Sequence, residues 1–382
     1  MENKKQNIEL ADVFSQHATT FLSAHTLSST QQKAFEDIVK CRTSELGGHV
    51  EKCNHCGYIR QSYNSCRNRH CPKCQFVKKE QWVDKLVANL PPVKHFHVVF
   101  TIPALLHKLF YINQAKAYSL LMQAAGQTLT QCAKKQYSGI QIGAVSILHT
   151  WGQTLVYHPH VHMIVPAGGL SEDQTEWIST GNKFFLPVKV LSQVFRGIMC
   201  RMIENSCSVN EIKMPEGLTD FRTLKSQCYL KKWVVYCEKP FSNSDRLIHY
   251  LGNYTHRVAI SNNRIVSHEN VVVRFSIKDY KAAGMRKHID LDANEFIRRF
   301  LQHVLPGGFC KIRYFGFLAL RNMNESLGIC FELIAAASYL PSLSGLCALD
   351  VWRTITGRDP IKCPKCAVGI LQSHSAPPLL IT

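Results

Sequence analysis

The chain has few acidic residues and no long apolar run. Its 382 residues include 45 Lys and Arg against 27 Asp and Glu, which gives a net charge of +18. No run of about 18 or more apolar residues appears, so no membrane-spanning helix is expected. The opening residues, MENKKQNIELADVFSQ, lack the apolar segment of a signal peptide. We therefore expect a cytoplasmic protein with no membrane partner, and the excess positive charge indicates a polyanionic partner such as nucleic acid.

Because disulfides are rare in the cytosol, the 16 cysteines need another explanation. Two C-x-x-C pairs, Cys53 with Cys56 and Cys71 with Cys74, are separated by 14 residues in a polar stretch. Two such turns at this spacing are typical of a tetrahedral zinc site with four thiolates. The stretch has too little apolar mass to fold alone, whereas a structural zinc contributes on the order of 10–16 kcal/mol. We predict one structural Zn²⁺ bound by these four cysteines.

Four further candidate ligands are interleaved with that set: Cys41, His49, Cys66 and His70. They could bind a second zinc in a crossed-over arrangement, or the histidines could be ordinary solvated side chains, and His55 is a competing ligand. Another C-x-x-C pair, Cys363 with Cys366, lies near the C-terminal end. A single pair is half of a zinc site, and the sequence does not show its partners.

The hydrophobic pattern predicts an antiparallel α+β fold. Helical periodicity covers residues 1–40, 76–90, 104–135 and 186–203, while β-branched and aromatic runs predict strands. The predicted strands cover residues 95–103, 144–151, 160–169, 231–241 and a hairpin at 264–280. We expect a helical and zinc-binding domain over residues 1–90, a catalytic domain over 91–340 and a C-terminal tail over 341–382.

The stretch YHPHVHMIV, residues 157–165, places three histidines at alternate positions in a predicted strand. Alternate residues share one face of a strand. Pro159 cannot donate a ladder hydrogen bond, so we expect the strand to begin near His160 and His158 to lie at its entrance. His160 and His162 then form a pair that could bind a divalent ion and leave positions open for a phosphate. Ordinary packed or solvated histidines are the alternative.

The stretch HYLGNYTHR places Tyr250 and Tyr254 four residues apart in a predicted helix, residues 244–260. Side chains at this spacing share one helix face, roughly 6 Å apart. Tyrosines so spaced are often core residues, but these lie in a cationic stretch, and a phenolate is a competent nucleophile.

Several of these stretches together resemble one known family, the HUH transposases with two tyrosines that are typified by insertion sequence ninety-one. The similar stretches are CRTSELGGHVEKCNHCG, YNSCRNRHCPKCQ, HFHVVFTIP, HPHVHMIVPAGG, WVVYCEKPF, YLGNYTHRVAISNNR and KIRYFGF. The resemblance implies an HUH endonuclease domain, an antiparallel sheet with flanking helices, preceded by a zinc-ribbon-like DNA-recognition module. It assigns a catalytic Mg²⁺ or Mn²⁺ to His160 and His162, and the paired nucleophiles to Tyr250 and Tyr254.

The resemblance also implies a reaction: nicking and rejoining of single-stranded DNA at the element ends through a 5′-phosphotyrosine, as in rolling-circle-like transposition. The chain contains no G-x-x-x-x-G-K-[ST] loop for ATP, and the covalent link would conserve the phosphodiester energy. The expected partners are single-stranded DNA and element-end DNA, with a homodimer as one option for the assembly. The third metal ligand stays open, and the candidates are Gln153, Glu238, Asp245 and His249.

Two other functions are consistent with parts of the sequence. Histidine-triad nucleotide hydrolases also alternate histidine with apolar residues, but they are far shorter, have no zinc module and use histidine as the nucleophile. A zinc-ribbon nucleic-acid-binding protein without catalysis would leave the histidines and tyrosines structural. A covalent protein–DNA adduct separates the transposase from both.

Overall fold

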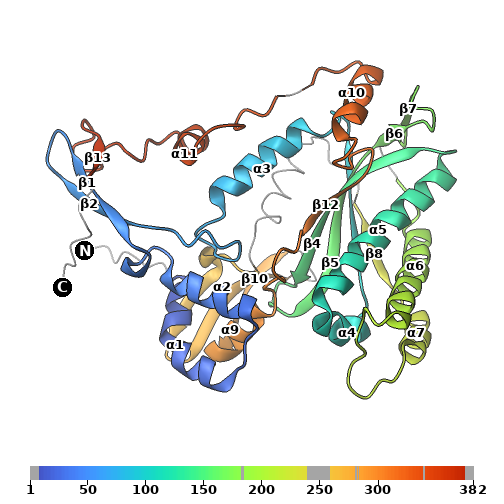
Figure 1. The fold of residues 1–382 in the computed structure, drawn as a ribbon, viewed down its shortest axis with the longest axis horizontal. Helices are drawn as coiled ribbons and strands as arrows, with labels where there is room; N and C mark the ends of the chain where they lie inside the picture. Colours follow the sequence, from blue (N-terminus) through green and yellow to red (C-terminus); the bar gives the residue numbers. More distant parts are fainter. Residues whose placement is uncertain are drawn as a thin grey trace.

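The chain folds around antiparallel strands in a computed structural model that describes residues 8–181, 185–238, 259–279, 282, 284–338 and 340–374 (Figure 1). A central seven-stranded sheet has the strand order β7-β6-β4-β5-β3-β8, with β12 paired to β4. Its strands are β3 (His95–Thr101), β4 (Gln141–Trp151), β5 (Tyr157–Pro166), β6 (Gly168–Leu170), β7 (Trp177–Ser179), β8 (Val234–Cys237) and β12 (Ile312–Gly316). All strand pairings recorded among the described residues are antiparallel, which confirms the α+β class.

Helices cover both faces of the central sheet. The larger core lies against α4 (His107–Ile112), which follows the short helix η2 (Ala104–Leu106), and against α5 (Gln114–Gln136), α6 (Val188–Ser208) and α7 (Phe221–Leu230). Phe100 and Val161 of the sheet point into this core. On the opposite face, Ile147 and Ile164 pack with α3 (Phe76–Ala88) and α10 (Met323–Leu333). The second half of β5 is apolar and buried on both faces, and its histidines lie in the first half of the strand.

A second core joins the N-terminal helices to a smaller sheet. Its elements are α1 (Leu10–Ala24), α2 (Ser29–Lys40), the short helix η3 (Asn262–Arg264), β9 (Ile265–Glu269), β10 (Val272–Asp279), β11 (Met285–Asp292) and α9 (Ala293–Leu301). Phe14 of α1 packs edge-on against Phe300 of α9, with ring centroids 5.4 Å apart. The predicted hairpin at 264–280 is confirmed as β9 and β10. Contacts therefore cross the boundary expected near residue 90, and the predicted helix 244–260 lies outside the described residues except at its end.

A third sheet joins the two ends of the described chain. The short helix η1 (Ser44–Leu46) precedes the hairpin of β1 (Gly48–Cys53) and β2 (Ile59–Tyr63), and β13 (Leu371–His374) pairs with β1. The chain reaches β13 from α10 by running back past α3 through α11 (Ala348–Thr356), as Figure 1 shows. The expected C-terminal tail thus packs on the N-terminal module.

The start of β5 differs from the sequence-based expectation. The strand begins at Tyr157, three residues before His160, and contains Pro159. The register between β4 and β5 shifts between His149 and Trp151, where two residues of β5 oppose one of β4. A proline that lacks an N–H is tolerated in this bulge. Among the described residues, we find no helix that combines the length and apolar character needed to cross a membrane.

Candidate metal centres

Three histidines meet on one face of the central sheet. The antiparallel register of β4 and β5 sets His149 opposite His160, and Ile147 opposite His162. The ligand atoms of His149, His160 and His162 all lie within 4.8 Å of one another. The predicted pair is therefore brought together, and we call the three residues the histidine cluster. His158 alternates with them but is not a member, and its ring centroid lies 5.3 Å from that of His160.

Hydrogen bonds fix which ring nitrogens can bind a metal. His160 Nδ1 lies 2.6 Å from the carbonyl oxygen of His158, which can only accept, so Nδ1 carries the proton and Nε2 keeps its lone pair. His162 Nδ1 lies 2.8 Å from Nε2 of His97, whose Nδ1 lies 3.4 Å from a Glu238 carboxylate oxygen. If each proton points toward the carboxylate, Nε2 of His162 also keeps its lone pair. Such carboxylate–histidine chains orient metal ligands in known sites.

Burial keeps these imidazoles in the form that binds metals. It lowers the pKa of His160 to about 4, and it lowers the pKa of His162 well below the usual value, with the neighbouring His149 as a further cause. Both rings are therefore neutral at pH 7, as metal ligation requires.

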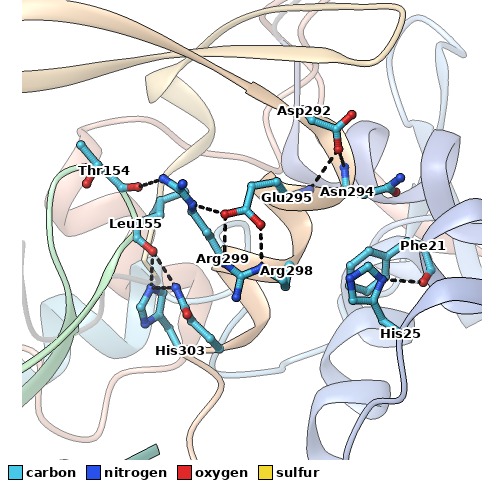
Figure 2. A network of polar contacts seen from close by, with 11 residues as sticks. Phe21, His25, Thr154, Leu155, Asp292, Asn294, Glu295, Arg298, Arg299 and His303 are labelled. Carbon is cyan, nitrogen blue, oxygen red and sulfur yellow. Dashed lines mark hydrogen bonds and ion pairs between the residues drawn. The ribbon is translucent and has the colours of Figure 1, made fainter. Parts of the chain in front are cut away.

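The loop between His149 and His160 is anchored by α9 and the residues after it. Arg299 donates to the carbonyl of Thr154, and the His303 ring lies 3.0 Å from the carbonyl of Leu155 (Figure 2). Glu295 in turn accepts hydrogen bonds from Arg298 and Arg299, which hold its pKa at about 2. The second core thus fixes the turn that sets the register of the histidines.

His149 is the ligand candidate that the sequence analysis missed. Part of its signal was present, because a hairpin that turns between residues 152 and 156 brings the end of its first strand beside His160, but the register shift is what sets His149 opposite that residue. Of the four residues considered as third ligand, Glu238 bonds to His97 instead, and Gln153 Oε1 accepts from the Lys278 amide. Asp245 and His249 lie outside the described residues.

Both predicted nucleophiles, Tyr250 and Tyr254, also lie outside the described residues. The segment that contains them follows β8, which pairs with β3 and ends beside Glu238. Tyr236 of β8 is 53% exposed, and its hydroxyl donates to Glu238 over 3.3 Å.

The structure sorts eight cysteines into two groups of four. Cys41, Cys66, Cys71 and Cys74 form one group, which we call the N-terminal cysteine cluster. Within it, the Sγ atom of Cys74 lies 3.4 Å from that of Cys41 and 3.6 Å from that of Cys66. Hydrogen bonds from Cys66 and the other thiols lower the pKa of Cys74. The pKa of Cys66 is lowered by its contact with Cys71, but its contact with Cys74 and its burial raise it to about 12. A metal ion that binds these thiols would displace their protons into solvent, because thiolates are the binding form.

The second group joins the two ends of the chain. Cys53 and Cys56, at the tip of the β1–β2 hairpin, meet Cys363 and Cys366 of the tail, and we call these four the bridging cysteine cluster. This pairing corrects the sequence analysis, which placed Cys53 and Cys56 with Cys71 and Cys74. The C-x-x-C turns were identified, but the hairpin carries the first turn away from the second (Figure 1).

The proposed second set, Cys41, His49, Cys66 and His70, is also divided. Its two cysteines belong to the N-terminal cysteine cluster, whereas neither histidine belongs to a described group. His49 lies 3.9 Å from Glu51, and His70 accepts from the Leu305 amide. Burial lowers the pKa of His70 to about 3. The backbone N–H of the competing ligand His55 contacts Cys53 Sγ, and His55 belongs to none of the metal-binding groups found among the described residues.

Comparisons with known proteins place these features in one class. A family model described as "Transposase zinc-binding domain" matches residues 13–102, and the model Y2_Tnp, described as "Putative transposase", matches residues 143–326. The first range contains the N-terminal cysteine cluster, and the second contains the histidine cluster. The α+β fold with its cysteine-rich N-terminal region is therefore that of a transposase, a protein that acts on DNA.

Full-length relatives identify the family. "Putative transposase y4qJ" of Sinorhizobium fredii is 41% identical over 371 residues, which cover 94% of this chain and 93% of the relative. "Transposase for insertion sequence element IS801" of Pseudomonas savastanoi pv. phaseolicola is 28% identical over 343 residues, which cover 87% and 81%. No solved structure matches. The chain belongs to the IS91-like family of transposases, which confirms the resemblance seen in the sequence.

Proposed function

We propose that this transposase nicks and rejoins single-stranded DNA at the ends of its element, in a rolling-circle-like reaction assisted by a divalent metal ion. The observation that carries the proposal is the histidine cluster, in which three imidazoles converge and His158 and His97 orient the rings of His160 and His162. Three protein ligands leave coordination positions open, which is the arrangement of catalytic rather than structural sites.

The donor set fits a divalent transition ion. All three donors are imidazole nitrogens, which suit Mn²⁺ better than Mg²⁺, because Mg²⁺ prefers oxygen ligands. When bound, the ion supplies Lewis-acid polarisation of the scissile phosphate. His149, His160 and His162 would hold it, and the Glu238–His97 pair would orient His162.

We assign the nucleophiles to Tyr250 and Tyr254. The phenolic oxygen attacks phosphorus as the bond to the 3′-oxygen breaks; the phenol loses its proton and the departing 3′-oxygen gains one. The products are a 5′-phosphotyrosine and a free 3′-hydroxyl, and attack by another 3′-hydroxyl reverses the step and joins strands. The proximity of β8 to the histidine cluster supports this assignment, because the chain continues from β8 into the segment that contains both tyrosines.

Basic side chains beside the loop between β4 and β5 support binding of a DNA backbone. A polar pocket beside the β4–β5 loop is lined by Gln153 and by three basic residues, Arg264, Lys278 and Arg286. Together with the net charge of +18, this pocket favours a phosphate-rich ligand.

We further assign a structural Zn²⁺ to the N-terminal cysteine cluster. Tetrahedral zinc with Zn–S bonds of about 2.3 Å separates its sulfur atoms by about 3.8 Å, and the recorded separations of 3.4 and 3.6 Å are close to this value. The cluster also lies inside the range matched by the zinc-binding domain.

Detection of a covalent adduct tests the proposed chemistry. The protein is incubated with a labelled hairpin-ended single strand and Mn²⁺, and adducts are resolved on a denaturing gel. Wild-type protein should form an adduct, as should the control Tyr236→Phe, whereas the Tyr250→Phe/Tyr254→Phe double variant should form none. An adduct from the double variant would move the nucleophile elsewhere, with Tyr280 the next residue to test, and no adduct from the wild type would favour a DNA-binding role without this chemistry.

A further inference from the structure

We propose that the bridging cysteine cluster is a second structural zinc site, which fastens the C-terminal tail to the N-terminal hairpin. Two of its residues, Cys363 and Cys366, lie far outside the matched zinc-binding domain, residues 13–102. The site is therefore separate from the one assigned to the N-terminal cysteine cluster, and it is assembled from both ends of the chain.

The sulfur atoms have the spacing of a zinc tetrahedron. Cys53 Sγ lies 3.8 Å from Cys366 Sγ, and Cys56 Sγ lies 3.6 Å from Cys363 Sγ. All four lie within 4.8 Å of one another. A tetrahedral Zn–S₄ site has sulfur separations of about 3.8 Å, whereas a disulfide would bring two sulfurs to about 2.05 Å.

The two C-x-x-C turns have the same backbone design. In the first, the amide of Gly57 donates to the carbonyl of Cys53; in the second, the amide of Ala367 donates to the carbonyl of Cys363. The residue after each second cysteine is left-handed, with φ of +70° at Gly57 and +55° at Ala367. Two equivalent turns that face each other are the construction of four-cysteine zinc ribbons.

Backbone amides also point at the sulfur atoms. The amides of His55 and Cys56 contact Cys53 Sγ at 3.4 and 3.5 Å, and the amide of Gly369 contacts Cys366 Sγ at 3.3 Å. Amide hydrogen bonds of this kind stabilise thiolate charge around a metal and orient the ligands. The bridging cysteine cluster thus has amide hydrogen bonds to its sulfur atoms, which are expected for metal-bound thiolates.

The tail fits closely against the hairpin. Asn54 exchanges two hydrogen bonds with Ile370, one through each backbone amide, and Arg60 donates to the carbonyl of Pro360. A Cβ atom on Gly369 would lie 2.5 Å from Cys53 Sγ and 2.6 Å from His55 Cβ, so only glycine allows this approach. The tail and the β1–β2 hairpin are therefore closely packed beside the sulfur atoms.

Little apolar surface is available to hold this contact without a metal. Among the residues that the structure describes, the buried hydrophobic cluster here consists of Cys53, Cys363 and Leu371, with Tyr58 and Cys366 packed beside it. So small a core provides little folding energy, whereas a structural zinc provides on the order of 10–16 kcal/mol. Zinc is accordingly the main stabilising element that we assign to this end of the molecule.

The bridging cysteine cluster lies at the C-terminal end of residues 340–362, a segment that runs along α3 and that we call the strap (Figure 1). Asp84 of α3 accepts from the Ser342 hydroxyl and the Leu343 amide, and the Phe76 ring meets the Trp352 ring of α11 at 5.0 Å. Zinc at the bridging cysteine cluster fixes the far end of this strap without contacting the histidine cluster. Its loss should release the tail and leave the catalytic sheet folded.

Zinc content and tail protection test the proposal on the full-length protein. Purified wild type should contain two zinc ions per chain, Cys363→Ser should contain one, and its tail should be cleaved at least tenfold faster in limited proteolysis. Cys347→Ser is the matched control, because Cys347 lies exposed in the same strap and outside both clusters, and it should keep both ions. Two ions in Cys363→Ser, or a single wild-type ion that only Cys71→Ser removes, would overturn the proposal.

A variant that keeps all four sulfurs gives an independent result. Gly369→Ala adds one methyl group against Cys53 Sγ and should release one of the two ions to a chelator at least tenfold faster than wild type. Gly328→Ala in α10 is the control, because a Cβ there meets nothing within 4 Å, and its release rates should match wild type. Unchanged release from Gly369→Ala would show that the tail does not approach Cys53 as the site requires.

Discussion

The histidine cluster and the two cysteine clusters are built in different ways. The histidines stand on neighbouring strands of a sheet packed on both faces, and hydrogen bonds from outside the cluster set their rings. The cysteines stand on turns, and most of their contacts are to one another or to nearby amides. Three ligands on a rigid frame suit an ion that acts on a substrate, whereas four on loops suit an ion that holds the loops together. Removal of a histidine ligand should therefore mainly reduce strand cleavage, whereas removal of a cysteine ligand should mainly unfold the surrounding region.

The largest effect is expected from the histidines, and it should be on strand cleavage rather than on DNA binding. His160→Ala combined with His162→Ala should reduce strand cleavage to background, because the ion that polarises the phosphate is no longer held. Affinity for the oligonucleotide, which basic residues supply, should stay within a few-fold of wild type. His158→Ala is the matched control on the same strand, since His158 is not one of the three ligands and the variant keeps the backbone carbonyl that contacts His160. Cleavage at the wild-type rate in the double variant would remove the metal assignment.

The reverse pattern is expected at the N-terminal cysteine cluster. Cys71→Ser should lose one zinc ion and unfold the region around residues 41–74, because the binding energy of a structural zinc is folding energy. Zinc analysis and hydrogen exchange measure both effects. Cys132→Ser serves as the control, because Cys132 is also buried but lies outside both clusters. Unchanged zinc in Cys71→Ser would contradict the four-thiolate assignment.

A smaller effect should follow from loosening the frame of the histidine cluster. Glu238→Gln keeps the shape of the side chain but removes the charge that orients His97 and, through it, His162. Loss of such an outer contact typically weakens metal binding about 10–100-fold. The Mn²⁺ concentration for half-maximal cleavage should rise accordingly, while the rate at saturating Mn²⁺ changes less. Glu216→Gln, at an exposed carboxylate elsewhere, should leave that concentration unchanged.

The smallest effect is expected on stability at low pH. It concerns His95, a buried histidine that is not part of the histidine cluster. Burial lowers the pKa of His95 to about 4, with a smaller opposing effect from the backbone of Val93. An unfolded histidine titrates near 6.5, so between pH 6.5 and 4 the unfolded state binds more protons, and stability falls as the pH falls.

His95→Leu removes this contribution and should flatten the pH dependence. Relative to pH 7, the variant should lose about 3 kcal/mol less unfolding free energy at pH 4 than the wild type does. Denaturant unfolding at a series of pH values measures the difference, in which any loss of zinc common to both proteins cancels. Parallel curves would show that the His95 ring is solvated or paired in solution.

The sequence identified individual metal ligands better than it identified which ligands meet in one site. Alternation in the strand was enough to select His160 and His162, because period-two patterns fix which side chains share a face. His149 required the register of the hairpin, which depends on a bulge at Pro159 that the sequence pattern did not reveal. The nucleophile assignments at Tyr250 and Tyr254 stay predictions.

Long-range pairing was the part that local patterns could not supply. Each C-x-x-C turn is defined by four consecutive residues, so Cys53/Cys56 and Cys363/Cys366 could each be recognised as half of a site. Which halves meet depends on the path of the tail past α3, set by contacts such as those between Asp84 and Leu343. The strands, the α+β class and the helix α3 were recovered, because their periodicity is local and strong.

The pairing of β13 with β1 has a consequence for biosynthesis. A ribosome adds about 5–20 residues per second, so the 313 positions between Cys53 and Cys366 take roughly 15–60 s to translate. During that time the N-terminal hairpin exists with one edge of β1 unpaired and two thiols without their partners. Only a chain translated through β13 can close this sheet, so a product that lacks β13 has an open strand edge that quality-control proteases and chaperones can detect.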